Sequence, residues 1–372
     1  MRFSEIGGLS EVRSKLVHAV QNTQIPHAQL FVGKKGSPNL SLALAYATFL
    51  NCETPTETDS CGTCASCVKI DKYVHPDIHF VFPVSTTKNV TGKDVISASF
   101  LKEWRSFLIE SPFGDVNQWA AAFGGEDKQA NISKEESRQI IKNLSLKSFE
   151  AKYKVMIIWL PEFMHPSAAN GILKILEEPP EKTVFLLVSN DHEKLLTTIL
   201  SRTQIVTVPK FTDQELASIL TEKHHLEDKR AQQIAHLADG DLNTALRLVN
   251  NIDNDNHALF ENLMRQCFKR DFTSMVQHSD NFHTMNKVAQ KSLLLYAMTM
   301  LRESLVRSST PELARINGKE GEFLENFSKV MSADKVFLIS EKLNQAHYHL
   351  ERNASAKMLF LNLSLQISKI IK

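Results

Sequence analysis

The sequence lacks both the excess charge and the long apolar segments that would indicate a nucleic-acid-binding or membrane protein. Its 372 residues carry 43 Lys and Arg against 42 Asp and Glu, a net charge of +1. No strong overall field draws the chain to DNA, so any contact with nucleic acid must be local or shared with partners. No run of 18 apolar residues predicts a membrane span, and the N-terminus lacks an apolar signal core. We expect a cytoplasmic protein.

Glycine and proline are scarce in the second half of the chain. Only three of the 13 glycines and one of the 12 prolines lie beyond residue 209. Their absence from 241–310 predicts consecutive helices, because these residues form turns and terminate helices. Before residue 209, short apolar runs alternate with helical patterns, which is typical of an α/β domain with a mainly parallel sheet. We expect buried strands at 29–33, 78–84, 155–160, 184–189 and 205–208, with helices that include 40–51, 134–144 and 166–178.

Helices are expected from residue 211 to the end. Thr212 and Glu215 have the spacing of a capping box at the start of a helix. The tail at 354–372 is ambiguous, because its leucines alternate as in a strand. The surrounding helix-forming residues and the lack of turn residues favour a helix there.

Cysteine is rare outside one short stretch. Four of the five cysteines follow the spacing C-x8-C-x2-C-x2-C: Cys52, Cys61, Cys64 and Cys67. The odd total and the tight cluster argue against a secreted disulfide scaffold. Four thiolates can close a tetrahedral shell around zinc and leave no open position for water, so a structural Zn2+ is expected at 52–67. An iron–sulfur cluster is a weaker alternative, and His75 and His79 are competing ligand candidates.

The turn after the first expected strand has the form of a phosphate-binding loop without its chemical groups. The working pattern is G-x-x-x-x-G-K-[ST], in which Lys reaches the phosphates and the hydroxyl holds magnesium. Counted from Gly33, with Gly36 inside the turn, the last three pattern positions carry Pro38, Asn39 and Leu40. Proline removes an amide donor, asparagine supplies no charge and leucine cannot bind magnesium. ATP hydrolysis is therefore not expected.

The second nucleotide element is also absent. An ATPase of this kind carries an Asp-Glu pair after a hydrophobic strand, to hold magnesium and orient water. Here the strand that begins at 155 continues into Trp159 and Leu160, neither of which coordinates a hard cation. Glu162 follows too late in the sequence to replace that pair.

Four passages together resemble a known family. They are PHAQLFVG at 26–33, continued by LNC at 50–52; HPD at 75–77; ANGILKILEEPP at 169–180; and TILSRT at 198–203. In these strings the chain resembles the delta-prime subunits of the bacterial DNA polymerase III clamp loader, a branch of the AAA+ clamp-loader family. Weaker similarity at 238–246 and 350–354 extends the resemblance over nearly the whole chain except 85–130.

The resemblance implies three domains. They are an AAA+ α/β module at 1–208, which contains the zinc knuckle at 52–67 and an insert at 85–130, a small helical lid at 209–250, and an all-helical collar at 251–372 that serves oligomerisation. It also implies a hetero-oligomeric loader in which gamma/tau subunits hydrolyse ATP and delta opens the sliding clamp. Delta-prime is then the non-hydrolysing member, which acts on the clamp and on primed DNA through the complex.

Arg202 is the residue that the resemblance marks for mechanism. The family's S-R-C motif, S-R-T here, places an arginine that reaches the ATP site of the neighbouring subunit. A guanidinium there stabilises the charge that develops on the γ-phosphate. The alternative is local: Arg202 caps a helix end or pairs with a nearby carboxylate.

Two further positions fit a subunit that does not use nucleotide. Active members carry a lid arginine where this chain has Asn243, which cannot supply the charge. Ser189 and Asn190 occupy the place of a polar sensor residue, and we interpret them as structural.

Five aromatic residues of the insert at 85–130 either form a partner-binding face or build a small local core, the second being the favoured interpretation. They are Trp104, Phe107, Phe113, Trp119 and Phe123.

Three functions compete at this stage. The leading hypothesis is a non-catalytic clamp-loader subunit that supplies an arginine finger to a neighbouring ATPase. The runner-up is an active gamma/tau-like ATPase with unusual loops. The third is a stand-alone zinc-containing DNA-binding protein, which the near-zero net charge disfavours.

Overall fold

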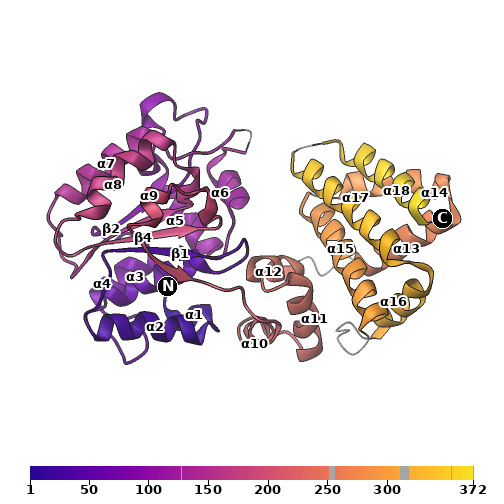
Figure 1. Cartoon of the computed structure of the whole chain (residues 1–372), viewed down its shortest axis with the longest axis horizontal. Coiled ribbons are helices and arrows are strands. Elements are labelled where there is room, and N and C mark those ends of the chain that lie inside the picture. Colours follow the sequence, from indigo (N-terminus) through magenta and orange to yellow (C-terminus); the bar gives the residue numbers. More distant parts are fainter. Residues whose placement is uncertain (127, 251–255, 286, 311–317, 353, 372) are drawn as a thin grey trace. The chain divides into compact units, whose positions relative to one another are not determined.

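The computed structural model describes residues 1–126, 128–250, 256–285, 287–310, 318–352 and 354–371 (Figure 1). The chain forms two compact units, Met1–Thr244 and Ala245–Lys372. The predicted boundary between residues 250 and 251 falls beside 251–255, which lie outside the described residues.

A five-stranded sheet forms the centre of the first unit. Its strands are ordered β2-β3-β4-β1-β5, and each neighbouring pair is parallel. The sheet confirms the predicted α/β fold class. The strands are β1 (Ala28–Val32), β2 (Ile78–Val81), β3 (Lys154–Trp159), β4 (Thr183–Ser189) and β5 (Gln204–Thr207).

Helices cover the sheet on both faces, with α7 and α8 on one side and α3 and α4 on the other (Figure 1). The three central strands are therefore almost entirely buried, because a parallel sheet covered on both faces has no solvent side. The helices of this part are α1 (Phe3–Ile6), α2 (Ser10–Gln21), α3 (Asn39–Leu50), α4 (Ala65–Asp71), α7 (Lys134–Ser145), α8 (Pro166–Glu177) and α9 (Thr197–Leu200).

Two strand predictions need correction. The second strand ends at Val81 rather than at 84, because Pro83 has no amide to donate and the Phe82 amide donates to Ser97 Oγ at 3.0 Å. The fifth strand lies at the edge of the sheet and is not buried: the side chain of Ile205 is 51% exposed.

The aromatic residues of the insert at 85–130, between β2 and α7, form a buried core, as the favoured interpretation predicted, and Trp104 of that core also stacks on Phe82, which lies outside the insert. Trp104 and Trp119 are fully buried, with ring centroids 5.0 Å apart, and Trp119 Nε1 donates to the Pro83 carbonyl at 2.7 Å. Phe107 and Phe123 join this core, whereas Phe113 is only half-buried. The insert contains the short helices η1 (Gly92–Asp94) and η2 (Ser97–Phe100), followed by α5 (Leu101–Glu110) and α6 (Val116–Phe123).

Three helices follow β5: α10 (Asp213–His224), α11 (Asp228–Ala238) and α12 (Leu242–Asn250). The predicted capping box at the start of α10 is confirmed, with Glu215 N donating to Thr212 Oγ1 and Thr212 N to Glu215 Oε2. The other carboxylate oxygen of Glu215 accepts the Leu9 amide at 2.9 Å, which ties these helices to the N-terminal segment. A separate lid domain at 209–250 stays a prediction.

The second unit is helical throughout its described residues. The tail prediction is confirmed: residues 356–371 form a helix whose Phe360, Leu363 and Ile367 are buried at helical spacing. Phe360 stacks on Phe282 with centroids 4.2 Å apart. The helices are α13 (Asn256–Lys269), α14 (Phe272–Thr284), α15 (Lys287–Ser309), α16 (Gly318–Val330), α17 (Ala333–Glu351) and α18 (Ala356–Ile371).

No helix within the described part of the chain combines the length and the apolar character needed to cross a membrane.

Asp77 of the HPD string fixes the loop that leads into β3. Its buried carboxylate accepts three consecutive amides, those of Phe149, Glu150 and Ala151, at 2.7–2.8 Å. Burial opposes ionisation, but the three amides outweigh it and hold the pKa of Asp77 below its ordinary value. The string is thus explained by a structural role.

Asp77→Asn should lower the free energy of unfolding by about 1.5–3 kcal/mol at pH 7, because the amides lose a charged acceptor. A depressed carboxyl pKa stabilises the fold above the unfolded-state pKa of about 3.9 and loses that effect as pH falls through the folded-state pKa. The difference between the two proteins should therefore shrink below about pH 4, as measured by urea unfolding. The exposed Asp94→Asn is the control and should change stability by less than about 0.5 kcal/mol. A pH-independent difference would contradict the assignment.

Candidate functional site

The predicted phosphate loop joins β1 to α3, where an ATPase would bind the phosphates. Gly36 has φ +92°, a left-handed conformation that favours glycine. A Cβ atom on Gly36 would lie 2.7 Å from the Cβ of Asp241, so the loop and the segment before α12 approach closely. The strand, turn and helix of a phosphate loop are present here in that order.

Asn39, at the position of the phosphate-binding lysine, bonds to protein groups instead. Its Nδ2 donates to the Ser189 carbonyl at 2.9 Å and to Asn190 Oδ1 at 3.0 Å, and its Oδ1 accepts the Leu40 amide at 3.0 Å. Asn39 and Leu40 are both buried. The structure thus joins the loop, by hydrogen bonds between neutral groups, to Ser189 and Asn190, the residues that stand in the place of a polar sensor and that we interpret as structural.

Trp159 lies at the end of β3, where a magnesium-binding carboxylate would stand. It is buried and packs against the insert, with its ring centroid 5.1 Å from that of Trp104 and 6.0 Å from that of Phe107. Glu162 Oε1 accepts the Asn190 amide at 2.9 Å, and burial raises the pKa of this carboxyl. Glu162 therefore supports the neighbouring loop rather than a metal ion.

The remaining space at the loop is small. The space open to water-sized molecules is about 40 Å3, enough for a few waters at about 10–15 Å3 each. The turn between α5 and α6 forms one wall, and Ser41 Oγ donates to the Pro112 carbonyl at 2.7 Å. Asn243, at the lid-arginine position, donates to Gln118 Oε1 of α6 at 2.8 Å.

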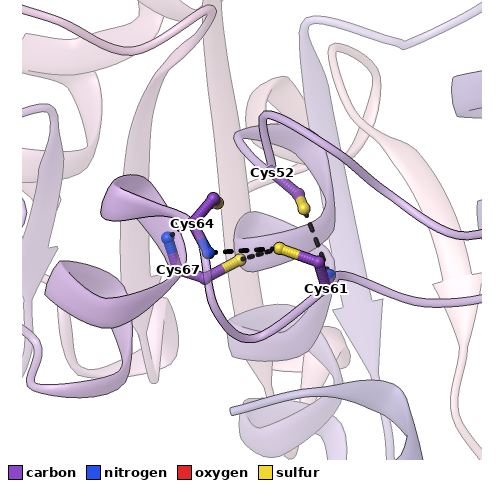
Figure 2. A group of neighbouring side chains, drawn as sticks. All are labelled: Cys52, Cys61, Cys64 and Cys67. Carbon is purple, nitrogen blue, oxygen red and sulfur yellow. Dashed lines mark hydrogen bonds between the residues drawn. The ribbon is translucent and has the colours of Figure 1, made fainter.

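The four clustered cysteines converge on one point (Figure 2). Their sulfur atoms all lie within 4.8 Å of one another, and the Cys61 and Cys67 sulfurs are 3.9 Å apart. Zn–S bonds of about 2.3 Å in a tetrahedron place sulfurs about 3.8 Å apart. The four side chains therefore fit a zinc ion.

Backbone amides point at the sulfurs of this cluster. Cys52 Sγ accepts the Cys61 amide at 3.2 Å, and Cys61 Sγ accepts the amides of Thr63 and Cys64 at 3.4 and 3.3 Å. The Thr54 hydroxyl and those two amides lower the pKa of Cys61 to about 5, whereas burial raises the pKa of Cys67. Amide donors of this kind favour the thiolate form that binds metal.

Arg202 follows α9 and is paired within the chain. Its Nε and Nη2 atoms each lie 2.9 Å from Glu177 Oε2, and Nη1 donates to the Thr198 carbonyl at 3.0 Å. The side chain of Arg202 is 30% exposed and that of Glu177 58%. The two most informative strings of the resemblance therefore meet, because Glu177 belongs to one and Arg202 to the other.

The sequence reasoning missed the residues that link the insert to the nucleotide site. Gln118 carried one readable signal: with Asp115 it has the spacing of a capping box, which the structure forms at the start of α6. Neither Ser41 nor Gln118 carries a signal of its distant partner, because these contacts join segments 71 and 125 residues apart.

Comparison with known proteins gives one family and several relatives. The sequence profile of the family described as "DNA polymerase III, delta subunit" matches residues 8–212, more than half of the chain. DNA polymerase III subunit tau of Escherichia coli K12 is 29% identical over 252 residues, which cover 66% of this chain and 32% of tau. DNA polymerase III subunit delta' of Bacillus subtilis 168 is 28% identical over 193 residues, covering 52% of this chain and 45% of that protein.

Among solved structures, a DNA polymerase III gamma subunit-related protein from Thermotoga maritima aligns over 97% of this chain and 99% of its own, at 16% identity and a TM-score of 0.40. The chain spans about a third of the length of E. coli tau and less than half of B. subtilis delta'. On the match over residues 8–212, the chain belongs to the DNA polymerase III delta-subunit family.

Proposed function

We propose that this chain is a non-hydrolysing, delta-prime-like subunit of the DNA polymerase III clamp loader. One observation carries the proposal: the positions that would hold phosphate and magnesium are Asn39, Leu40 and Trp159, and each is buried against protein. The backbone frame around them persists. Such a subunit contributes structure to the loader and leaves hydrolysis to its neighbours.

Arg202 gives this subunit a part in its neighbour's reaction. The guanidinium is partly exposed, and a single carboxylate oxygen of the more exposed Glu177 holds two of its nitrogens. An exposed ion pair is weak, typically below about 1 kcal/mol, so a γ-phosphate presented by an adjacent subunit can compete for the arginine. In the assembled loader Arg202 would then stabilise the charge that develops during hydrolysis.

The proposed partners are the gamma/tau and delta subunits, with the sliding clamp and primed DNA reached through the complex. The proposed location is the cytoplasm. Cys52, Cys61, Cys64 and Cys67 would hold a structural zinc ion, because four thiolates leave no position for substrate or water.

The names of the relatives favour a second candidate, an active gamma/tau-like motor, because E. coli tau aligns over 66% of this chain. The side chains at the nucleotide site oppose it. ATP binding separates the two proposals.

A fluorescent ATP analogue, titrated against the purified chain with and without magnesium, should show no magnesium-dependent binding tighter than a Kd of about 1 mM. The reason is that Asn39 and Leu40 replace the lysine and the hydroxyl of a working phosphate loop, and Trp159 stands in place of the magnesium-binding carboxylate. Competition with unlabelled ATP controls for binding of the dye. Micromolar, magnesium-dependent binding would favour the active gamma/tau-like ATPase over the non-hydrolysing subunit.

Arg202→Ala should slow ATP hydrolysis at the adjacent subunit's site by a factor on the order of 10³. The total DNA- and clamp-stimulated ATPase rate of the loader should fall by the part that this one site contributes. Phosphate release from loader assembled with each variant measures this. Arg138→Ala removes another surface arginine with a local carboxylate partner and should leave turnover unchanged. Equal turnover with Arg202→Ala, at equal assembly, would sink the arginine-finger proposal.

Cys64→Ser should remove most of the bound zinc, because a hydroxyl is a poor substitute for one of four thiolates. Elemental analysis of the purified protein gives the metal-to-protein ratio. Cys267→Ser is the matched control, since this buried cysteine belongs to the helical second unit and should keep the ratio at one. Full zinc occupancy in Cys64→Ser would refute the four-cysteine site.

A further inference from the structure

The insert between β2 and α7 contacts the degenerate nucleotide site at each of its main elements. Trp104 and Phe107 of α5 pack on Trp159, the residue in place of the magnesium-binding carboxylate. Pro112 accepts a hydrogen bond from Ser41, two positions after the residue that replaces the phosphate-loop lysine. One segment thus reaches both the strand end and the phosphate-loop helix.

The same segment reaches the helix that follows the fold's last strand. Gln118 Oε1 accepts from Asn243 Nδ2 at 2.8 Å, and it also accepts the Asp115 amide at 2.9 Å within the capping box of α6. Asn243 stands where an active subunit would place an arginine on the nucleotide. In an active subunit a nucleotide would connect the α/β core to the helices that follow β5. Here Gln118 of α6 makes that connection by its bond to Asn243 of α12.

The turn that carries these contacts is rigidly held. Gly114 lies so close to Phe107 that a Cβ atom on it would approach the ring to 2.6 Å. Asp115 Oδ1 accepts the amides of Asn117 and Gln118, which fixes the start of α6. The aromatic core under the turn is fully buried, so its position is set by packing rather than by a ligand.

We propose that the insert is an internal substitute for nucleotide: it closes the degenerate site and fastens the segment at α12 to the α/β core, so that this unit keeps one arrangement with or without ATP. In a nucleotide-driven subunit, ligand contacts hold core and lid together and are lost after hydrolysis. Here side chains of the insert make those contacts. They are part of the same chain and cannot dissociate as a ligand does, so their effective concentration at the site stays constant. The inference rests on the proposed non-hydrolysing function and assigns the insert its part in it.

Hydrogen–deuterium exchange on the full chain tests the proposal. Asn243→Ala removes the bond to Gln118 and leaves the capping box of α6 intact. Amide exchange in α12 should rise by roughly three- to tenfold, the effect of losing one hydrogen bond that holds the segment closed. Ser41→Ala should raise exchange in the 111–115 turn by a similar factor. Asn117→Ala, an exposed neighbour of Gln118 on the same helix, should change neither segment.

Addition of ATP and magnesium to the unmodified chain should leave exchange in the phosphate loop and in α12 unchanged. Two results would overturn the proposal: unaltered exchange in both Asn243→Ala and Ser41→Ala, or protection of these segments by ATP in the unmodified chain. The first result would leave the non-hydrolysing function and the Arg202 result intact. The exchange experiment uses the isolated chain and does not measure ATP hydrolysis. The second would also show that nucleotide binds at this site and would contradict the observation on which the proposed function rests, so the two failures are distinguishable.

Discussion

The packing of the insert on Trp159 is the contact on which the arrangement of the candidate functional site depends. A parallel sheet ends its strands at one edge, and in a nucleotide-binding protein that edge must stay open to phosphate and magnesium. A buried indole at the end of β3 makes the edge apolar instead. The rings of Trp104 and Phe107 cover it, and the cost of leaving such surface in water makes their removal unfavourable.

The other features of the site follow from that covering. Once the insert lies over the edge, its turn is close enough for Pro112 to accept from Ser41, and its second helix is close enough for Gln118 to accept from Asn243. Asn39, in place of the phosphate-loop lysine, donates to two neutral oxygens and accepts the Leu40 amide; an ammonium could donate to those oxygens but could not accept the amide. Each of these side chains thus has a partner within the site.

Two other centres are built independently of the insert. The cysteine cluster depends on short-range geometry, since tight turns and amide donors bring four sulfurs together within a 16-residue stretch. Arg202 depends on the meeting of two helix ends, where Glu177 supplies a carboxylate to the guanidinium. In the proposed loader these centres serve different purposes, one holding the fold and the other reaching a neighbour.

The sequence by itself determined the α/β class, the helical second half, the cysteine cluster and the replacement of the phosphate-loop lysine and hydroxyl by Asn39 and Leu40, because each of these follows from local spacing or from the residue at one motif position. It also determined that the insert is rich in aromatic residues. Tertiary structure alone decided that β5 is an exposed edge, that Pro83 ends β2 early, and that Glu177 pairs with Arg202. It alone decided that the insert contacts Ser41 and Asn243, because these contacts join residues far apart in the chain, and no periodicity in one sequence records which distant segments will touch.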